Sequence, residues 1–183
     1  MSLFVVSGPS GAGKGTVVRK ALQRRPDILV SVSVTTRPIR PGERDGLDYH
    51  FISRSEFVAM RDRGELLESA EVFGHFYGTP RTPIEDALAA ERPVIAELDI
   101  QGAASVKRAL PDAVLIFIEA PSLEDLYLRL RGRGTEDPEA LSRRVRAAYE
   151  EVKAKGLYDH IIVNDEVGRA AEELLRILEQ EGA

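Results

Sequence analysis

Short apolar runs recur along the chain and are separated by stretches whose apolar residues repeat at helical spacing. A run of four to eight apolar residues bounded by turn signals is consistent with a strand that is buried on both faces. Such runs lie at residues 3–7, 93–99, 113–118 and 160–163, and a β-branched stretch at 28–34 predicts a further strand. Because strands and helices alternate, the pattern predicts an α/β fold with a parallel sheet that is flanked by helices on both faces.

The helices between these runs are expected from their periodicity and from capping signals. Periodicity predicts helices at residues 17–24, 101–110, 139–155 and 166–179. A Ser or Thr followed three residues later by an acidic residue is typical of a helix N-terminus. Such pairs are Ser53 with Glu56, Thr82 with Glu85 and Ser122 with Asp125. They predict three further helices, of which the first ends at Gly64.

Residues from about 34 to 80 interrupt the alternation. The loop at 35–44 contains two prolines, a glycine and three arginines, so no regular element is expected there. The segments that follow are a short strand at 48–52, the helix after Ser53 and a hairpin at 66–78. The pattern therefore predicts a small β-rich insertion between two α/β stretches.

A glycine-rich stretch separates the first strand from the first helix. It consists of Gly8, Pro9, Ser10, Gly11, Ala12, Gly13, Lys14, Gly15 and Thr16. The backbone N–H groups of such a loop point toward one place, which also lies at the positive end of the helix dipole. Glycines allow an anion to approach closely, and Lys14 adds a mobile positive charge. The stretch therefore predicts a loop that binds the phosphates of a nucleotide.

The match to the phosphate-loop pattern has one departure. Gly8, Gly13 and Lys14 fit the spacing G-x-x-x-x-G-K, but Gly15 replaces the hydroxyl residue that usually follows the lysine. The alternative is a glycine-rich turn with a solvated lysine, and the strand before the loop and the helix after it disfavour that alternative. The departure leaves open how a Mg²⁺ ion would be held.

The composition narrows the class of protein. The chain has 183 residues, 43% of them hydrophobic, which suits one domain with a full core. A net charge of -5 disfavours a general nucleic-acid surface, and the lack of cysteine excludes disulfides. No apolar run is long enough to span a membrane, and the chain enters the first strand at once. We therefore expect no membrane partner, no signal peptide and a cytoplasmic location.

Arginines gather in two groups. One is Arg37, Arg40 and Arg44, and the other is Arg129, Arg131, Arg133, Arg143, Arg144 and Arg146. Guanidinium groups bind phosphate in a bidentate manner, although charged runs more often form a solvated face. We favour a solvated face for Arg131, Arg143 and Arg146, and phosphate binding for Arg37 and Arg40. Together with the phosphate loop, the two groups indicate two phosphate-bearing ligands that meet in a cleft.

The sequence resembles guanylate kinases over essentially its whole length. The resemblance lies in segments 31–43, 48–51, 70–79, 97–102, 130–134 and 162–165, which occur in the same order. It implies a P-loop NTPase core that transfers a phosphoryl group from MgATP to GMP, with dGMP also accepted. It implies a monomer or small homo-oligomer that has small-molecule nucleotides as its partners.

The resemblance also implies roles for individual residues. Lys14 would hold the β- and γ-phosphates of ATP within the loop at 8–16, with Arg133 and Asn164 beside the adenine. The GMP phosphate would be clamped by Arg37, Arg40, Tyr49 and Tyr77. The guanine base would be read by Ser33, Glu68, Thr79 and Asp99. The transferring group would be surrounded by the catalytic residues Lys14, Arg37, Arg129 and Arg144.

The same resemblance implies how the chain is divided. The core would comprise about 1–33, 81–128 and 156–183, with a GMP-binding insertion at about 34–80 and a helical lid at about 129–155. The insertion and the lid would close over the substrates to exclude water. Mg²⁺ would lie near Thr16, Glu97 and Asp99, in contact through water.

Other interpretations stay open at this stage. A related module that binds phosphoproteins without catalysis typically lacks a working phosphate loop, which this sequence has. A kinase for another base is disfavoured by Ser33 and Glu68, because a carboxylate accepts from both N1–H and N2–H₂ of guanine. Glu68 also fits an ordinary surface carboxylate, and Tyr49 and Tyr77 fit ordinary strand aromatics.

Overall fold

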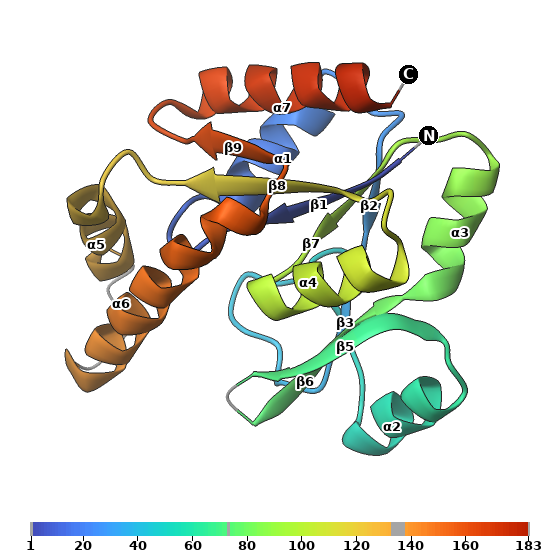
Figure 1. Cartoon of the computed structure of the whole chain (residues 1–183). Coiled ribbons are helices and arrows are strands. Elements are labelled where there is room, and N and C mark those ends of the chain that lie inside the picture. The colour runs from blue at the N-terminus through green and yellow to red at the C-terminus, as the bar shows by residue number, and fades with distance from the viewer. Residues whose placement is uncertain (1, 73, 133–137, 183) are drawn as a thin grey trace.

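A computed structural model describes the chain except for Met1, Phe73, residues 133–137 and Ala183 (Figure 1). Its centre is a five-stranded sheet in the order β2-β7-β1-β8-β9. The strands are β1 (Leu3–Ser7), β2 (Leu29–Ser31), β7 (Val94–Glu97), β8 (Val114–Glu119) and β9 (His160–Val163). Every neighbouring pair is parallel, which confirms the predicted α/β fold.

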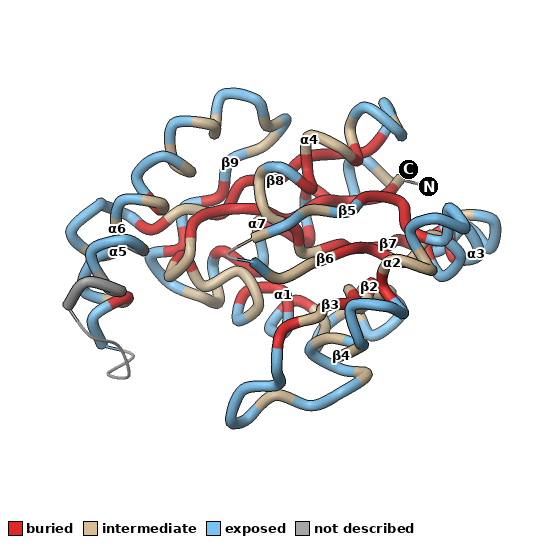
Figure 2. The backbone as a smooth tube through the Cα atoms, turned by 90° about the horizontal axis from the view of Figure 1, so that it is seen from below, coloured by how far each residue is buried: buried red, intermediate tan, exposed pale blue. Residues whose placement is uncertain are grey.

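Alternate residues of the central strand β1 pack on opposite faces of this sheet. One face is covered by α1 (Lys14–Leu22) and α7 (Val167–Glu181), and the other by α3 (Arg81–Ala89) and α4 (Ile100–Ala109). Phe4 and Val6 pack toward the first pair of helices, and Leu3 and Val5 pack toward the second. All four side chains are buried, so the central strand has no polar face. Figure 2 shows that buried residues gather in the middle of the molecule, along strands such as β7 and β8.

The segment at 34–80 contains a second, smaller sheet in the order β4-β3-β6-β5. Its elements are β3 (Val34–Thr35), β4 (His50–Phe51), α2 (Arg54–Asp62), β5 (Leu66–Val72) and β6 (His75–Pro80). Strands β5 and β6 form the predicted antiparallel hairpin. Val34, Phe57 and Leu66 form a small core that is separate from the core of the main sheet.

The single strand expected at 28–34 is wrong, because the chain forms two strands there in two different sheets. Strand β2 ends at Ser31 and pairs with β7, whereas β3 begins at Val34 and pairs with β6. Val34 packs with Phe57 in the small core. Apolar alternation looks the same whether one strand continues or a second strand begins over another core. As a consequence, Ser33 lies at the junction of the two sheets.

Helices α5 (Leu123–Arg131) and α6 (Pro138–Lys153) form a pair, and the short 3-10 helix η1 (Ala154–Leu157) leads from α6 toward β9. Leu126, Leu130 and Ala148 join the two helices in a small apolar cluster. The side chains of 138–141 and Arg144 lie outside the described part of the chain. None of the helices in that part is both long and apolar enough to cross a membrane.

Two of the three capping predictions are confirmed. The Ser53 hydroxyl accepts from the Glu56 N–H at 3.2 Å, and the Ser122 hydroxyl accepts from the Asp125 N–H at 3.0 Å. The helix is present, but the cap predicted at Thr82 is wrong, because α3 begins two residues earlier than Pro83 and its N-cap, Pro80, makes no side-chain hydrogen bond. The backbone of Arg81 instead donates to Glu65, so the start of α3 is tied to the small sheet.

Candidate active site

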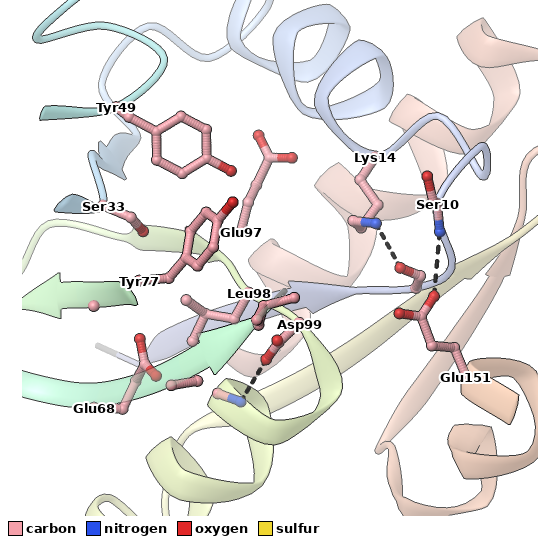
Figure 3. A pocket seen from close by; sticks show the side chains of 15 residues that line it. Ser10, Lys14, Ser33, Tyr49, Glu68, Tyr77, Glu97, Leu98, Asp99 and Glu151 are labelled. Atoms are coloured by element: carbon pink, nitrogen blue, oxygen red, sulfur yellow. Dashed lines mark hydrogen bonds between the residues drawn. The ribbon is translucent and has the colours of Figure 1, made fainter. Parts of the chain in front are cut away.

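The phosphate loop and the small sheet line a common cavity of about 290 Å³ (Figure 3). Its walls come from the loop after β1, the end of β7, the small sheet and α6. The lining side chains that carry chemistry are Ser10, Lys14, Ser33, Tyr49, Glu68, Tyr77, Glu97, Asp99 and Glu151. The cavity lies at the carboxyl ends of the parallel strands, which is where open α/β sheets bind their ligands.

Two glycines of the loop have conformations and surroundings that exclude a side chain. Gly8 has a φ of 143°, and a Cβ there would lie 2.0 Å from the carbonyl oxygen of Ile118. Gly13 has a φ of 88°, and a Cβ there would lie 2.4 Å from Nδ2 of Asn164. Only glycine fits these positions, so the loop is packed closely against β8 and the end of β9.

Lys14 is the first residue of α1 and folds back over the loop. Its Nζ donates to the carbonyl oxygen of Gly8 at 2.5 Å and to that of Pro9 at 3.3 Å. Burial raises the pKa of the Glu97 and Glu151 carboxyls, and the charge of Lys14 acts in the opposite direction on both. The phosphate end of the cavity thus combines the Lys14 ammonium with two carboxyl groups whose pKa values its positive charge lowers.

Glu68 of β5 lies at the other end of the cavity and is only 8% exposed. Its Oε1 accepts from the Thr79 hydroxyl at 2.7 Å. Burial raises its pKa to about 7, with Asp99 adding to the rise and the Thr79 bond opposing it. Thr79 itself is fully buried and does not line the cavity, so its hydroxyl contacts Glu68 and not the cavity space.

Asp99 follows β7 and forms the N-cap of α4. Its Oδ1 accepts from the Gly102 N–H at 2.7 Å, which fixes the carboxylate at the helix N-terminus. A Cβ on Gly102 would lie 3.2 Å from Oε2 of Glu68 and 3.3 Å from Oδ1 of Asp99. Gly102 therefore leaves room for the two carboxylates to approach the same end of the cavity.

Tyr49 and Tyr77 line the wall between the two ends, and Ser33 lies beyond them on the side of Glu68 (Figure 3). The tyrosine rings contact edge to face, with centroids 6.0 Å apart. Burial raises the pKa of Tyr49, so its phenol keeps its proton and remains a hydrogen-bond donor at neutral pH. This wall offers hydroxyl groups to a ligand that extends along the cavity.

Arg37 and Arg40 do not line the cavity in the described structure. Arg37 is buried and makes a bidentate ion pair with Glu43, at 2.6 and 2.7 Å, while its guanidinium lies 4.9 Å above the Tyr49 ring. Arg40 is exposed, and its backbone N–H also donates to Glu43. The ion pair and Tyr49 therefore fix the Arg37 side chain next to the cavity wall.

The structure describes only part of the predicted arginine-bearing segment. The Arg129 Nη2 donates to the carbonyl oxygen of Asn164 at 2.8 Å, and neither residue lines the cavity. The Asn164 side chain is buried and donates to the carbonyl oxygen of Ala12 at 2.7 Å. Arg133 and the Arg144 side chain lie outside the described residues.

A comparison with known families decides the class of the protein. The family model described as guanylate kinase matches residues 1–181. The chain belongs to the guanylate kinase family. The resemblance seen in the sequence is confirmed, and the chain is an enzyme of the nucleoside monophosphate kinase class, a group of phosphotransferases.

Individual members of the family cover nearly the whole chain. Guanylate kinase of Gloeobacter violaceus is 50% identical over 98% of this chain and 87% of its own. That of Thermobifida fusca is 49% identical over 96% of this chain and 90% of its own. The crystal structure of guanylate kinase from Anaplasma phagocytophilum has a TM-score of 0.83 and 36% identity, covering 99% of this chain and 86% of that one.

Sequence reasoning missed two acidic residues that the fold places at the site of this family member. Glu43 pairs with Arg37, six residues earlier in the same irregular loop, and no helix or strand periodicity marks this spacing. Glu151 accepts from the Ser10 N–H at 3.2 Å, across 141 residues of sequence. No local pattern distinguishes Glu151 from the other charged residues of α6.

The residues expected near Mg²⁺ form no metal cluster by themselves. In the described parts of the chain, no three His, Cys, Asp or Glu side chains gather closely enough to hold a metal ion. Thr16 is exposed, and Glu97 lies beside the loop, with its Oε2 3.4 Å from where a Cβ of Gly15 would be. Glu97 and Thr16 thus offer hard oxygen atoms beside the loop, as Mg²⁺ requires.

Proposed function

We propose that this enzyme transfers the γ-phosphoryl group of MgATP to the phosphate of GMP or dGMP and forms ADP and GDP or dGDP. The observation that carries the proposal is the common cavity, which has the phosphate loop with Lys14 at one end and Glu68 at the other. A donor held at the loop and an acceptor held at Glu68 would meet inside it. Membership of the guanylate kinase family supports the same reaction.

The base end has the hydrogen-bonding groups that guanine requires. An ionised Glu68 accepts from both N1–H and N2–H₂, whereas adenine has an acceptor at N1 and no 2-amino group. Thr79 holds the Glu68 carboxylate in place, and Asp99 and Ser33 add polar groups on either side. We infer that these four residues read the base, with Thr79 acting through Glu68.

The phosphate of GMP would lie along the wall formed by Tyr49 and Tyr77. Arg37 lies directly behind Tyr49, and we infer that it binds the phosphate with its orientation fixed by Glu43. Arg40 is exposed in the same loop and would complete the clamp. This arrangement keeps the acceptor phosphate between the base site and Lys14.

The chemical step needs no protein nucleophile. An oxygen of the GMP phosphate attacks the γ-phosphorus in line, and the bond from the γ-phosphorus to the oxygen that bridges it to the β-phosphate breaks. The electron pair of that bond leaves with ADP. Lys14, Arg129 and Arg144 would neutralise the charge on the transferring group, so the enzyme acts by positioning and electrostatics.

Mg²⁺ fits this site through the phosphates of ATP and ordered water. Glu97 and Thr16 would hold it, with Asp99 farther along the same edge of the sheet. The ion would supply charge neutralisation on the β- and γ-phosphates.

A coupled assay of ADP release with GMP, dGMP, AMP, UMP and CMP tests the proposal. We expect turnover with GMP and dGMP and little with the other three. Equal rates with AMP would contradict guanine reading, and GMP-independent ATP hydrolysis at the same rate would contradict phosphoryl transfer. The cytoplasmic location and the monomeric or small oligomeric state stay predictions.

A further inference from the structure

Two side chains that come late in the sequence contact the phosphate loop, one from the cavity wall beside Lys14 and the other from behind the loop. Asn164 follows β9 and contacts Ala12, and Glu151 lies near the end of α6 and contacts Ser10. The Asn164 side chain donates a hydrogen bond to the loop, and the Glu151 carboxylate accepts one from it. Asn164 was expected beside the adenine of ATP, and Glu151 had no expected role.

The backbone of Asn164 is fixed by two hydrogen bonds, one at its N–H and one at its carbonyl oxygen. Its backbone N–H donates to Glu119 at 2.8 Å, and its carbonyl oxygen accepts from Arg129 at 2.8 Å. Its buried Nδ2 then donates to the Ala12 carbonyl oxygen at 2.7 Å, in the space that a side chain at Gly13 would fill. The fold therefore fixes this side chain against the loop.

The hydrogen bond from Asn164 to Ala12 fixes the direction of the Gly13 N–H. The Ala12 C=O and the Gly13 N–H belong to one planar trans peptide unit, so they point in opposite directions. When Asn164 holds the carbonyl, the Gly13 N–H is turned away from Asn164. The orientation of the Gly13 N–H, which we expect to face the phosphates, thus depends on the Asn164 amide.

Glu151 acts in the opposite sense on the peptide unit between Pro9 and Ser10, three units earlier in the loop. It accepts the Ser10 N–H at 3.2 Å, and that N–H shares its peptide plane with the Pro9 C=O (Figure 3). The Pro9 carbonyl oxygen in turn accepts from the Ala12 N–H at 3.1 Å and from Lys14 Nζ at 3.3 Å. Fixing the Ser10 N–H therefore fixes a carbonyl that helps to place Lys14.

We propose that Asn164 and Glu151 are positioning residues that hold the phosphate loop in its binding conformation, so that affinity for the triphosphate of ATP depends on both. The inference rests on the proposed function, because it assumes that the loop binds a triphosphate. It assigns Asn164 to the phosphates through Ala12 rather than to the adenine.

The test uses linear tripolyphosphate, which has the phosphates of ATP but no base. Isothermal titration with tripolyphosphate, ATP and GMP compares wild type with Asn164→Ala, Glu151→Ala and Glu151→Gln. We expect both alanine variants to lose about fivefold to tenfold in affinity for tripolyphosphate and ATP alike, the range for one hydrogen bond. GMP affinity should stay within about twofold, and Glu151→Gln, which keeps an acceptor oxygen, should restore most of the loss.

Glu150→Gln is the matched control, because Glu150 lies next to Glu151 on α6 but is exposed and pairs with Lys153 at 2.8 Å. Its affinities should equal those of wild type. If Asn164→Ala does not fold, Asn164→Ser, which is too short to reach Ala12, takes its place.

Three results would overturn the proposal. Loss of ATP affinity with unchanged tripolyphosphate affinity would make Asn164 an adenine contact. Unchanged or tighter tripolyphosphate binding in Glu151→Ala would show that the carboxylate only repels the ligand. An equal loss for GMP would indicate general structural damage. A wild type that binds neither ATP nor tripolyphosphate would instead contradict the proposed function.

Discussion

The two ends of the cavity are built in different ways. The phosphate end is built around the backbone of the continuous segment 8–16, whereas the base end consists of side chains from distant segments, such as Ser33, Glu68 and Asp99. The backbone end depends on glycine conformations and leaves little room for change. The side-chain end depends on burial, which raises the pKa of the Glu68 carboxyl to about 7. The difference predicts that the two ends will respond differently to mutation and to pH.

The largest expected effect is at the phosphate end. We expect Lys14→Met to lower kcat by about 10²-fold or more, because it removes a charge from the transferring group. GMP affinity should change little, since Lys14 is far from Glu68 in the cavity. Steady-state kinetics and GMP titration measure both, with Lys20→Met as the control on the exposed face of α1. A variant with near wild-type kcat would contradict the role of the loop.

The next largest effect is at the base end. Glu68→Gln should lower kcat/KM for GMP by roughly 30- to 150-fold, because an amide offers one acceptor and one donor where guanine has two donors. Glu71→Gln on the exposed face of the same strand is the control. The ratio of kcat/KM for GMP and AMP measures the selectivity. An unchanged ratio in Glu68→Gln would mean that Glu68 does not read the base.

A further prediction concerns Arg37, which lies behind Tyr49 at the wall between the two ends. Arg37→Ala should weaken GMP binding by about 30-fold, corresponding to about 2 kcal/mol for a charge-assisted hydrogen bond, and leave ATP binding unchanged. Titration with each nucleotide separately measures this, with Arg44→Ala from the same loop as the control. Equal losses for ATP and GMP would contradict separate binding sites.

The smallest effect is the pH response of the base end. A carboxyl with a pKa of about 7 is mostly protonated at pH 6 and mostly ionised at pH 8. Only the ionised form accepts from both guanine donors, so affinity should fall about tenfold from pH 8 to pH 6. Guanosine is the probe, because it lacks a phosphate that titrates in this range. A flat profile, or the same slope in Glu68→Gln, would assign the pH response to another group.

The contrast between the two ends also explains what the sequence predicted. The loop at 8–16 and the parallel sheet follow from local spacing and from apolar runs, and both need only neighbouring residues. The junction at Ser33 was not predictable, because a separate core around Phe57 decides where β2 stops. The start of α3 was misplaced for a similar reason, since the backbone of Arg81 is held by Glu65, directly before β5 of the small sheet.

The side-chain partners were the hardest part to predict. The partners of Arg37 and Glu68 became visible only in the fold, since Glu43 and Thr79 bind them across a loop and a hairpin. Glu151 had no signal in the sequence, because its partner lies 141 residues away. Burial, which raises the pKa of Glu68, is likewise a property of the assembled fold.

The contact between Ala12 and Asn164 has a consequence for the protein while it is being made. The two residues are 152 positions apart, and a ribosome that adds about 5–20 residues per second needs roughly 8–30 s to cover that distance. During this time the phosphate loop has emerged but lacks the residue that shapes it. Under the proposed role of Asn164, nucleotide binding and the stabilisation that it brings are therefore expected only after strand β9 has joined the sheet.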